Sequence, residues 1–377
     1  MNKKTKSGGA GKLFLIFLFA CIVAGGAYVA LVFFEKSPPE AAILGSTDFI
    51  GKEAHFSLTA QDQQSGLQHI KLLIRQKDKE YVLLEESFPR KRYTGQIGPE
   101  SFARELNIDI QESTVTDGEA EIIFTATDYS LRGFFSGNST TLQKSVIIDT
   151  KPPQLRILHA ERYIDQGGSG VVIYQLDETV EKHGAQFAGH FHKGHSTGDG
   201  RDNVYLAFLA VPYDTSKLEN SMVIAEDRAG NQATQSFSPV LKEVSFKHDR
   251  INVDDNFLSK KIPEFEGYYP EMQGDMVEKY LYTNRIIRQE NNKEIAEICG
   301  NSVTERLWEG RFLRMAGASR AGFADHRTYY YQGKEIDRQV HLGMDIASTR
   351  HAEVKAANRG KVVFADYLGI YGNMVIL

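Results

Sequence analysis

Alternating apolar and polar residues fill most of the chain between about residues 37 and 249. The runs are short and rich in valine, isoleucine, leucine, phenylalanine and threonine, and turn residues such as the DQQSG at 62–66 separate them. Alternation with a period of two is typical of strands that bury one face. Such runs include HFSLTA, HIKLLIRQ, EYVLLEE, AEIIFTA and SVIID, and then QLRIL, VVIYQL, VYLAFLAV and ATQSFS. The pattern predicts a mainly β protein.

The strand pattern is interrupted once, by DTKPPQL at 149–155. Pro152 and Pro153 cannot donate hydrogen bonds to a central strand ladder, so they favour a boundary or an edge strand. We therefore expect two immunoglobulin-like β-sandwich modules, at 37–150 and at 151–249.

Two strand ends in these modules echo each other. Ala126-Thr127-Asp128 closes a run in the first module, and Ala225-Glu226-Asp227, followed by Gly230-Asn231, closes one in the second. The second of these resembles the D-x-A-G-N strand ends of bacterial immunoglobulin-like domains. The echo is too short to establish a duplication.

Residues 250–317 change to a helical pattern, which we interpret as a helical connector. Between 274 and 300, Asp275 is placed to cap the start of a helix and Gly300 to end it. The apolar positions recur at helical spacing. They are Met276, Val277, Tyr280, Leu281, Asn284 and Ile287, the asparagine being the polar member of the stripe.

The N-terminus carries an uncharged apolar run of 22 residues from Leu13 to Phe34. As a helix it would span roughly 33 Å, enough to cross a bilayer. Lysines precede the run and the first acidic residue follows it, so the positive-inside rule predicts a cytoplasmic tip and an extracytoplasmic, periplasmic chain. A signal peptide cleaved near Ala24-Gly25-Gly26 is the alternative, and a lipoprotein at Cys21 is a weaker one.

Composition narrows the function classes. The net charge of −5 gives no global basic field, so we expect no nucleic-acid partner. Cys21 lies in the apolar run and Cys299 stands far from it, so we expect no disulfide. We expect Cys299 to be a buried small apolar residue.

Strand-like runs return from about residue 318, and one of them holds a histidine and an aspartate four residues apart. RQVHLGMDIAS at 338–348 contains His341 and Asp345. Positions four apart share one face of a strand, and Gly343 between them permits a bulge or a close backbone approach. Zinc binds imidazole nitrogen and carboxylate oxygen at about 2.0–2.2 Å. The spacing therefore allows a metal site, although it also arises by chance.

The surroundings of this pair resemble the lysostaphin-type, or LytM-like, zinc metallopeptidases. That family carries H-x-G-x-D-[IL]-A, then V-x-A-A-x-x-G-x-V, then G-Y-G-N-x-V-x-I, and the resemblance covers about residues 318–377. The matching residues are His341, Gly343, Asp345, Ile346, Ala347, Val354, Ala356, Ala357, Gly360, Val362, Gly369, Tyr371, Gly372, Asn373 and Val375.

The resemblance implies an antiparallel β domain with a substrate groove, a zinc cofactor, and hydrolysis of peptide cross-links in peptidoglycan. His341 and Asp345 would be two zinc ligands. The family supplies the third ligand and a catalytic base from a later H-x-H motif, and this sequence has no H-x-H after Asp345. The later histidine here is His351. We expect the chain to be a fragment of a longer protein, with a natural, inactive truncation as the alternative.

Other residues are weaker candidates. His326, Arg327 and a neighbouring tyrosine such as Tyr330 could face the substrate groove, where a tyrosine hydroxyl could stabilise an oxyanion; packing within a strand would explain them equally. A second cluster, GHFHKGH, has metal-compatible spacing. We interpret it as solvated histidines in a glycine-rich loop of the second module, since it lies far before His341. Its histidines are His190, His192 and His195.

The leading hypothesis is a single-pass, membrane-anchored zinc endopeptidase of the cell envelope, with peptidoglycan as substrate and a regulatory envelope protein as a further partner. A non-catalytic scaffold or activator with a degenerate peptidase domain is the alternative, and an adhesin-like binding protein is the third. The predicted organisation is 1–36 cytoplasmic tip and transmembrane anchor, 37–150 and 151–249 β-sandwiches, 250–317 helical connector, and 318–377 incomplete peptidase domain.

Overall fold

Strands make up 43% and helices 17% of the structure, a computed structural model. It describes residues 9–33, 36–45, 48–92, 95–110, 114–131, 136–303 and 305–377. The predicted mainly β class is confirmed. The chain divides into two compact units, and each is described by itself: the first is Met1–Pro153 with Glu226–Ala233, and the second is Gln154–Ala225 with Thr234–Leu377.

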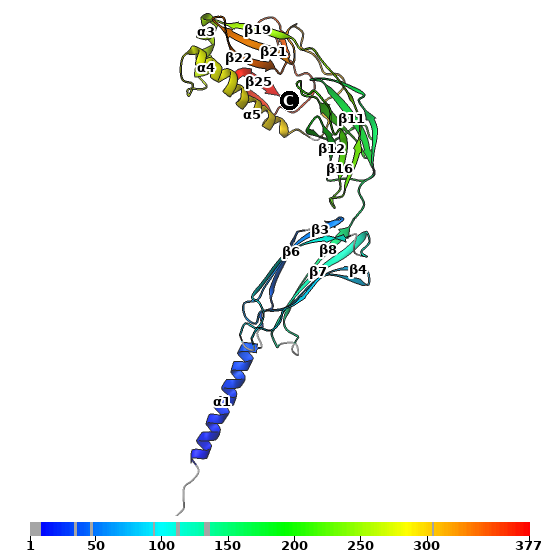
Figure 1. Ribbon diagram of the computed structural model, residues 1–377, viewed down its shortest axis with the longest axis vertical. Coiled ribbons are helices and arrows are strands. Elements are labelled where there is room, and N and C mark those ends of the chain that lie inside the picture. Colours follow the sequence, from blue (N-terminus) through cyan, green and yellow to red (C-terminus); the bar gives the residue numbers. More distant parts are fainter. Residues whose placement is uncertain are drawn as a thin grey trace, which may run out of the picture. The chain divides into compact units, whose positions relative to one another are not determined.

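The N-terminal apolar run forms the helix α1, Gly9–Phe33 (Figure 1). Its window Gly11–Val29 is long and apolar enough to cross a membrane, and its side chains are exposed. The predicted apolar helix is confirmed. A signal sequence close to an N-terminus has the same length and composition, so both readings of this segment stay open.

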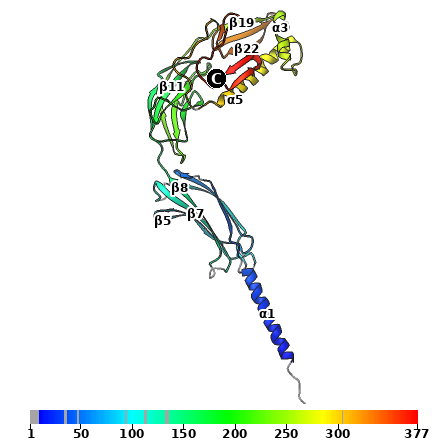
Figure 2. The ribbon, with the colours of Figure 1, turned by 180° about the vertical axis from the view of Figure 1, so that it is seen from behind.

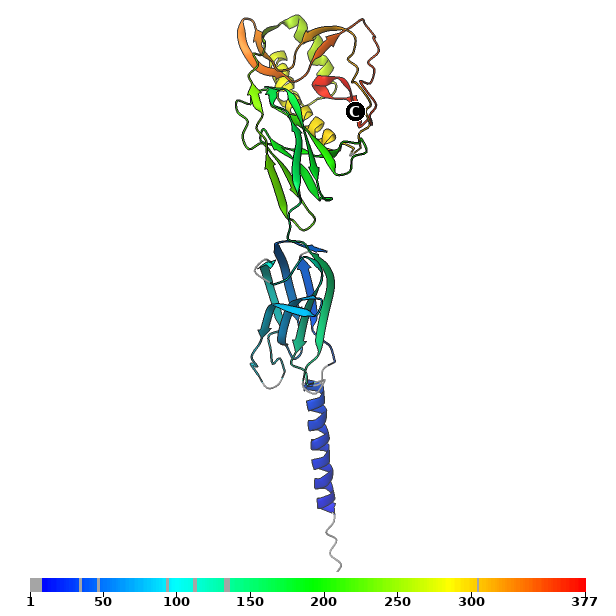
Figure 3. The same cartoon turned by 90° about the vertical axis from the view of Figure 1, so that its right-hand side faces the viewer.

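The first unit is a sandwich of two sheets, ordered β1-β3-β6 and β2-β8-β7-β4-β5 (Figures 1 and 3). Strand β3 alternates exposed and buried side chains along its length, as its sequence predicts. Phe56, Leu58, Leu72 and Phe124 meet in the core between the sheets. The strands are β1 Glu40–Gly45, β2 Phe49–Ile50, β3 Glu53–Gln61, β4 Leu67–Gln76, β5 Lys79–Ser87, β6 Ser101–Asp109, β7 Gly118–Asp128 and β8 Ser139–Ile148.

The second unit begins with another pair of sheets, ordered β14-β15-β11-β9 and β13-β12-β16-β17, and the short parallel pair β10-β18. Its separate core contains Tyr174, Phe187, Leu209 and Val223. The strands are β9 Leu155–Ala160, β10 Tyr163–Asp165, β11 Ser169–Leu176, β12 Lys182–Phe187, β13 His190–Lys193, β14 His195–Ser196, β15 Val204–Ala210, β16 Met222–Glu226, β17 Gln232–Ser236 and β18 Val240–Lys242.

The two echoing strand ends share a pattern of hydrogen bonds to their aspartates. Asp128 accepts hydrogen bonds from the backbone N–H of Ser130 and from both the backbone N–H and the side-chain amide of Asn138. Asp227 accepts the corresponding set from Ala229 and Asn231. Both aspartates are buried, so each turn satisfies a carboxylate that would otherwise be costly to bury.

The expected connector at 250–317 is only partly helical. The helices are α3 Asp255–Glu266, α4 Met276–Tyr282, the π-helix η2 Thr283–Ile287 and α5 Arg288–Gly300. Residues 250–253 instead belong to strand β19, His248–Val253, and the described residues of 301–317 form no helix. The strand forms because Ile251 and Val253, two apart, pack against Leu258 and Tyr329.

The predicted helix ends are confirmed. The Asp275 side chain accepts hydrogen bonds from the backbone N–H groups of Val277 and Glu278, and the Glu278 side chain accepts one from the backbone N–H of Asp275, which completes a capping box. Helix α5 ends at Gly300. The π-helix was not foreseen. It places Asn284 and Arg285 on the carboxylate of Asp337, a buried residue of the neighbouring sheet.

The C-terminal strands form three small sheets. β19 pairs parallel with β21, Asp325–Tyr331, which pairs antiparallel with β22, Lys334–His341. β20, Ala318–Ala321, pairs with β23, Asp345–Ala347, and β24, Phe364–Tyr367, pairs with β25, Asn373–Ile376. Two expectations are wrong: VHLGMDIA is broken into β22 and β23, and EVKAA at 353–357, fully described, contains no strand.

The β24–β25 hairpin lies against α5 (Figure 2). The backbone N–H of Ile370 donates to Asn291 Oδ1 at 3.0 Å, and the Tyr371 hydroxyl donates to Asn292 Oδ1 at 2.7 Å. Gly369 lies in the short 3₁₀ helix η3, Gly369–Tyr371, at φ +41°, where a Cβ would come within 2.3 Å of Asn291 Oδ1. Glycine is therefore required for this hairpin to reach the helix.

Candidate metal centre

His341 and Asp345 are in contact. His341 is the last residue of β22 and Asp345 the first of β23, and His341 Nε2 lies 3.2 Å from Asp345 Oδ1. The sequence suggested that the two side chains share a face of one strand. The structure shows that they do not. The turn at 342–344, which contains Gly343, brings them together instead.

A hydrogen bond from its Nδ1 atom sets the orientation of the His341 ring. Its Nδ1 lies 2.8 Å from the carbonyl oxygen of Gly322, which can only accept a hydrogen bond, so Nδ1 carries the proton. The buried carboxylate of Asp325 accepts from the N–H of Gly322 at 2.8 Å and holds that peptide in place. Such a contact behind an imidazole is the usual arrangement for a metal-binding histidine.

This orientation leaves two acceptors facing each other. A neutral His341 with its proton on Nδ1 has a lone pair on Nε2, and that lone pair points at a carboxylate oxygen 3.2 Å away. The arrangement is stable only with a positive charge between the two atoms, either a proton on Nε2 or a metal cation. The pair is therefore an ion pair or two ligands of one metal.

The distance fits zinc. Bonds of about 2.0–2.1 Å at tetrahedral angles put two ligand atoms roughly 3.3 Å apart, close to the 3.2 Å between His341 Nε2 and Asp345 Oδ1. His341 and Asp345 account for two of the ligand positions around a zinc ion. Within the described residues, no group of three or more histidine, cysteine, aspartate or glutamate side chains could hold a metal ion.

Arg327 completes the surroundings of Asp345. Its Nη2 lies 3.3 Å from Asp345 Oδ2, the carboxylate oxygen that turns away from His341. The Arg327 side chain is mostly buried, while Asp345 is about half exposed. One oxygen of Asp345 thus faces the imidazole, and the other has a guanidinium partner.

The other predicted groove residues lie on the opposite face of β21. Successive side chains of a strand point to opposite faces, so His326 and Tyr330 face away from Arg327. His326 stacks on His248 with ring centroids 4.8 Å apart, and Arg250 lies 3.7 Å above the ring of Tyr330. Of the three predicted groove residues, only Arg327 contacts the candidate metal pair.

Sequence analysis missed the partners of these residues. Gly322 and Asp325, which orient His341, carry no motif of their own, and His248 lies in a segment expected to end the second sandwich. A parallel pairing between β19 and β21 brings His248 beside His326. The run HDRINV alternates in polarity and was the available signal for that strand.

The GHFHKGH histidines lie on strands β13 and β14, so the expectation of a solvated loop is wrong for them. His192 is partly buried, and its Nε2 has no hydrogen-bond partner among the described residues. Burial, with smaller contributions from His195 and Lys193, lowers the pKa of nearby His183 to about 4. The His183 Nδ1 lies 2.7 Å from the Tyr174 hydroxyl.

Cys299 is exposed rather than buried, and both cysteines, in described segments, are free thiols.

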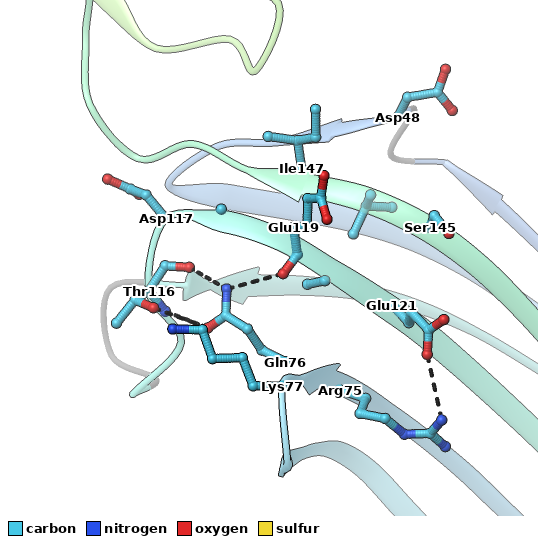
Figure 4. A pocket seen from close by; sticks show the side chains of 13 residues that line it. Asp48, Arg75, Gln76, Lys77, Thr116, Asp117, Glu119, Glu121, Ser145 and Ile147 are labelled. Atoms are coloured by element: carbon cyan, nitrogen blue, oxygen red, sulfur yellow. Dashed lines mark hydrogen bonds and ion pairs between the residues drawn. The ribbon is translucent and has the colours of Figure 1, made fainter.

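The first sandwich has a large open cavity of about 860 Å³ (Figure 4). Gln76 crosses its floor and exchanges hydrogen bonds with Thr116. Some of the charged side chains around it are paired, as Arg75 is with Glu121 and Asp117 with Lys151. Hydrogen bonds from Lys151 and Thr150 lower the pKa of Asp117. The cavity therefore presents a polar surface with paired charges along part of its lining.

Comparison with known proteins assigns no family to this chain. No protein family and no curated protein matches the sequence. Solved structures that match include a Bacteroides ovatus protein, SGBP-B of a mixed-linkage glucan utilization locus, in complex with a heptasaccharide (14% identity, 58% of this chain and 51% of that chain, TM-score 0.17). An ICAM-5 D1–D4 ectodomain fragment matches at 12% identity, over 54% of each chain, with a TM-score of 0.24.

Murine CEACAM1b matches at 10% identity, over 54% of this chain and all of that chain, with a TM-score of 0.26. The chain spans about half the length of the first two structures. It is a mainly β protein with an N-terminal apolar helix.

Proposed function

We propose that this chain belongs to a membrane-anchored zinc endopeptidase of the LytM type, which hydrolyses peptide cross-links of peptidoglycan. The observation that carries the proposal is the pair His341 and Asp345, whose facing Nε2 and Oδ1 atoms lie 3.2 Å apart, a separation that suits two ligands of one zinc ion. The run H-x-G-x-D-I-A around the pair supports the same assignment.

Each residue of the pair has a defined part in this proposal. His341 Nε2 and Asp345 Oδ1 would hold the zinc, and the Gly322 carbonyl would keep the His341 proton on Nδ1. Arg327 would limit the charge on Asp345 and fix its rotamer. A bound zinc supplies a Lewis acid and a water acidic enough to be deprotonated near neutral pH.

The remaining parts of the chain have supporting roles in the proposal. Helix α1 would anchor the protein in the membrane and leave the rest outside the cytoplasm. The sandwiches at 37–150 and 151–249 would bind the wall or a regulatory envelope protein, and residues 250–317 would connect them to the peptidase region. Catalytic zinc sites have three protein ligands and one open position, so hydrolysis requires a third ligand besides His341 and Asp345.

The test is zinc binding by the full chain in detergent, measured by titration against a chelator of known affinity. We expect His341→Asn and Asp345→Asn each to weaken zinc binding at least tenfold, because each removes one of two ligands. His351→Asn is the matched control: His351 is exposed and has φ +61°, which asparagine tolerates. Zinc binding that both site variants leave unchanged would overturn the proposal.

A non-catalytic scaffold is the second candidate. Arg327 already occupies one oxygen of Asp345, and the described residues place no third ligand beside the pair. In that case the chain would sediment with purified peptidoglycan, His341→Asn would sediment equally well, and zinc would release no soluble fragments. Release of fragments by the full chain, abolished by a chelator, would exclude the scaffold.

A further inference from the structure

A second cavity lies on the face of the β19-β21-β22 sheet that carries His326. Its volume is about 510 Å³. The second sandwich contributes one lining residue, strand β19 another, and strands β21 and β22 the rest. The lining residues are Tyr213, His248, His326, Arg327, Thr328, Arg338, Gln339 and Val340.

The lining is rich in groups that bind anions. The imidazoles of His248 and His326 and the guanidinium of Arg338 lie on the cavity's face of the sheet, and none of its eight described lining residues carries a carboxylate. Tyr213 and Thr328 add neutral donors. A cavity that is lined by donors and lacks acidic groups favours an anionic occupant.

The acidic neighbours of the cavity are bound to its own arginines. Glu335 accepts from Arg338 Nε at 2.7 Å and from its Nη2 at 3.1 Å, a two-point contact. Asp345 accepts from Arg327 Nη2 at 3.3 Å. The Arg338 guanidinium has five N–H donors in a plane, so it keeps donors for a second acceptor besides Glu335.

Ring stacking fixes one wall of the cavity. His248 and His326 lie parallel within 17°, with centroids 4.8 Å apart, and Tyr213 meets His326 edge-on at 6.0 Å. Strand pairing places His248 directly beside His326 and Arg338 beside Thr328. The donors therefore come from regular strands rather than from loops.

We propose that this cavity binds the free carboxylate of a peptide. The inference rests on the proposed function, because peptidoglycan peptides carry carboxylates beside the bonds that would be cleaved. The donors that carry the proposal are His248, His326 and Arg338, which lie on one face of the sheet, opposite the face on which Arg327 contacts Asp345.

The test compares two probes on the full chain in detergent, with a chelator present so that metal plays no part. One probe is N-acetyl-trialanine with a free C-terminal carboxylate, and the other is the same peptide as its C-terminal amide. We expect the carboxylate to bind about tenfold more tightly, as charge-assisted hydrogen bonds allow, and to lose affinity as salt is raised. Equal binding of the two peptides would overturn the inference.

Substitutions locate the effect. Arg338→Gln and His248→Gln should each remove most of the preference for the carboxylate. Arg250→Gln is the matched control, since Arg250 lies on the same face of the same sheet, against Tyr330 and outside the cavity. A preference that survives Arg338→Gln and His248→Gln, in proteins whose thermal unfolding is unchanged, contradicts the assignment. Inorganic phosphate that competes better than acetate does also contradicts it, because it indicates a general oxyanion site.

The two proposals fail in different ways. If zinc binds at His341 and Asp345 but the peptides bind equally, the cavity assignment alone is wrong. If the carboxylate preference persists in His341→Asn and no zinc is bound by the parent protein, the cavity stands and the zinc peptidase does not.

Discussion

The first sandwich and the region at 318–377 are held together by different means. In the sandwich, β3 and β6 pair over all nine of their residues, and Phe56 and Phe124 are almost completely buried between the sheets. At 318–377 the strands have three to eight residues, while Val354 is 81% and Val375 65% exposed. Hydrogen bonds and ion pairs to neighbouring helices hold that region, together with a small apolar cluster that includes Tyr329. The candidate chemistry thus lies where polar contacts and a small core set the geometry.

The largest effect is expected in the core of the sandwich. Phe124→Ala should lower the free energy of unfolding of the first unit by about 3–5 kcal/mol, because it removes a buried ring and leaves a cavity. Val375→Ala, in the C-terminal hairpin, should change stability by less than about 0.5 kcal/mol, since the side chain is largely exposed. Denaturant unfolding of each variant measures its change in the free energy of unfolding. Similar losses would remove the contrast between the regions.

The second-largest effect on stability is expected at Asp337, which anchors the C-terminal region through hydrogen bonds. Asp337 accepts hydrogen bonds from Asn284 at 2.7 Å, Arg285 at 2.9 Å and Gln339 at 3.1 Å, and its side chain is buried. Asp337→Ala leaves these donors without their acceptor and should cost about 2–3 kcal/mol in the second unit. Glu335→Ala, on the same strand but with an exposed partner, is the control, with an expected cost under about 0.5 kcal/mol. Thermal unfolding followed by near-UV circular dichroism distinguishes the two.

A smaller effect should depend on pH. Burial lowers the pKa of His183 from 6.5 to about 4 in the folded protein. Between these values the unfolded chain binds a proton that the folded chain excludes, so stability is complete above pH 6.5 and falls as the pH drops towards 4. Because His183 is only partly buried, we expect a loss of about 1–2 kcal/mol, less than the full pKa shift implies.

Urea unfolding of the second unit at pH 7 and at pH 4.5 measures this loss. His183→Gln should reduce the difference between the two pH values, whereas His159→Gln, with an exposed ring on strand β9 of the same sandwich, should leave it unchanged. An unaltered difference in His183→Gln would assign the pH dependence to other groups.

The sandwich strands were predictable because their pattern is local. HFSLTA alternates residue by residue and coincides with β3, and AEIIFTA, an apolar run flanked by alternating positions, coincides with β7. The helix ends at Asp275 and Gly300 were equally local, since a cap depends on a few neighbouring residues. Such features need no knowledge of distant partners.

The rest of the candidate site depends on contacts between distant segments. His341 and Asp345 could be named from a motif, but the Gly322 carbonyl that orients His341 comes from another strand connection 19 residues earlier. His248 joins His326 through a strand that lies 78 residues away in sequence and was read as the end of a sandwich. EVKAA alternates like a strand yet has no partner to pair with in the described structure. In each of these cases the structure depends on which strands pair with one another. The periodicity of the sequence alone does not reveal that pairing.

The π-helix at 283–287 marks the place where this helical run carries one residue more than a regular α-helix needs. Each residue of an α-helix turns the chain by about 100°, and a π turn absorbs one extra residue while the turns on either side keep their direction. Deleting one residue there would therefore close the π turn into a regular helix and leave Asn291 and Asn292 facing the β24–β25 hairpin. It would remove the widened turn from which Asn284 and Arg285 reach Asp337. A single missing codon would thus preserve every helix and still loosen the sheet that carries Asp337.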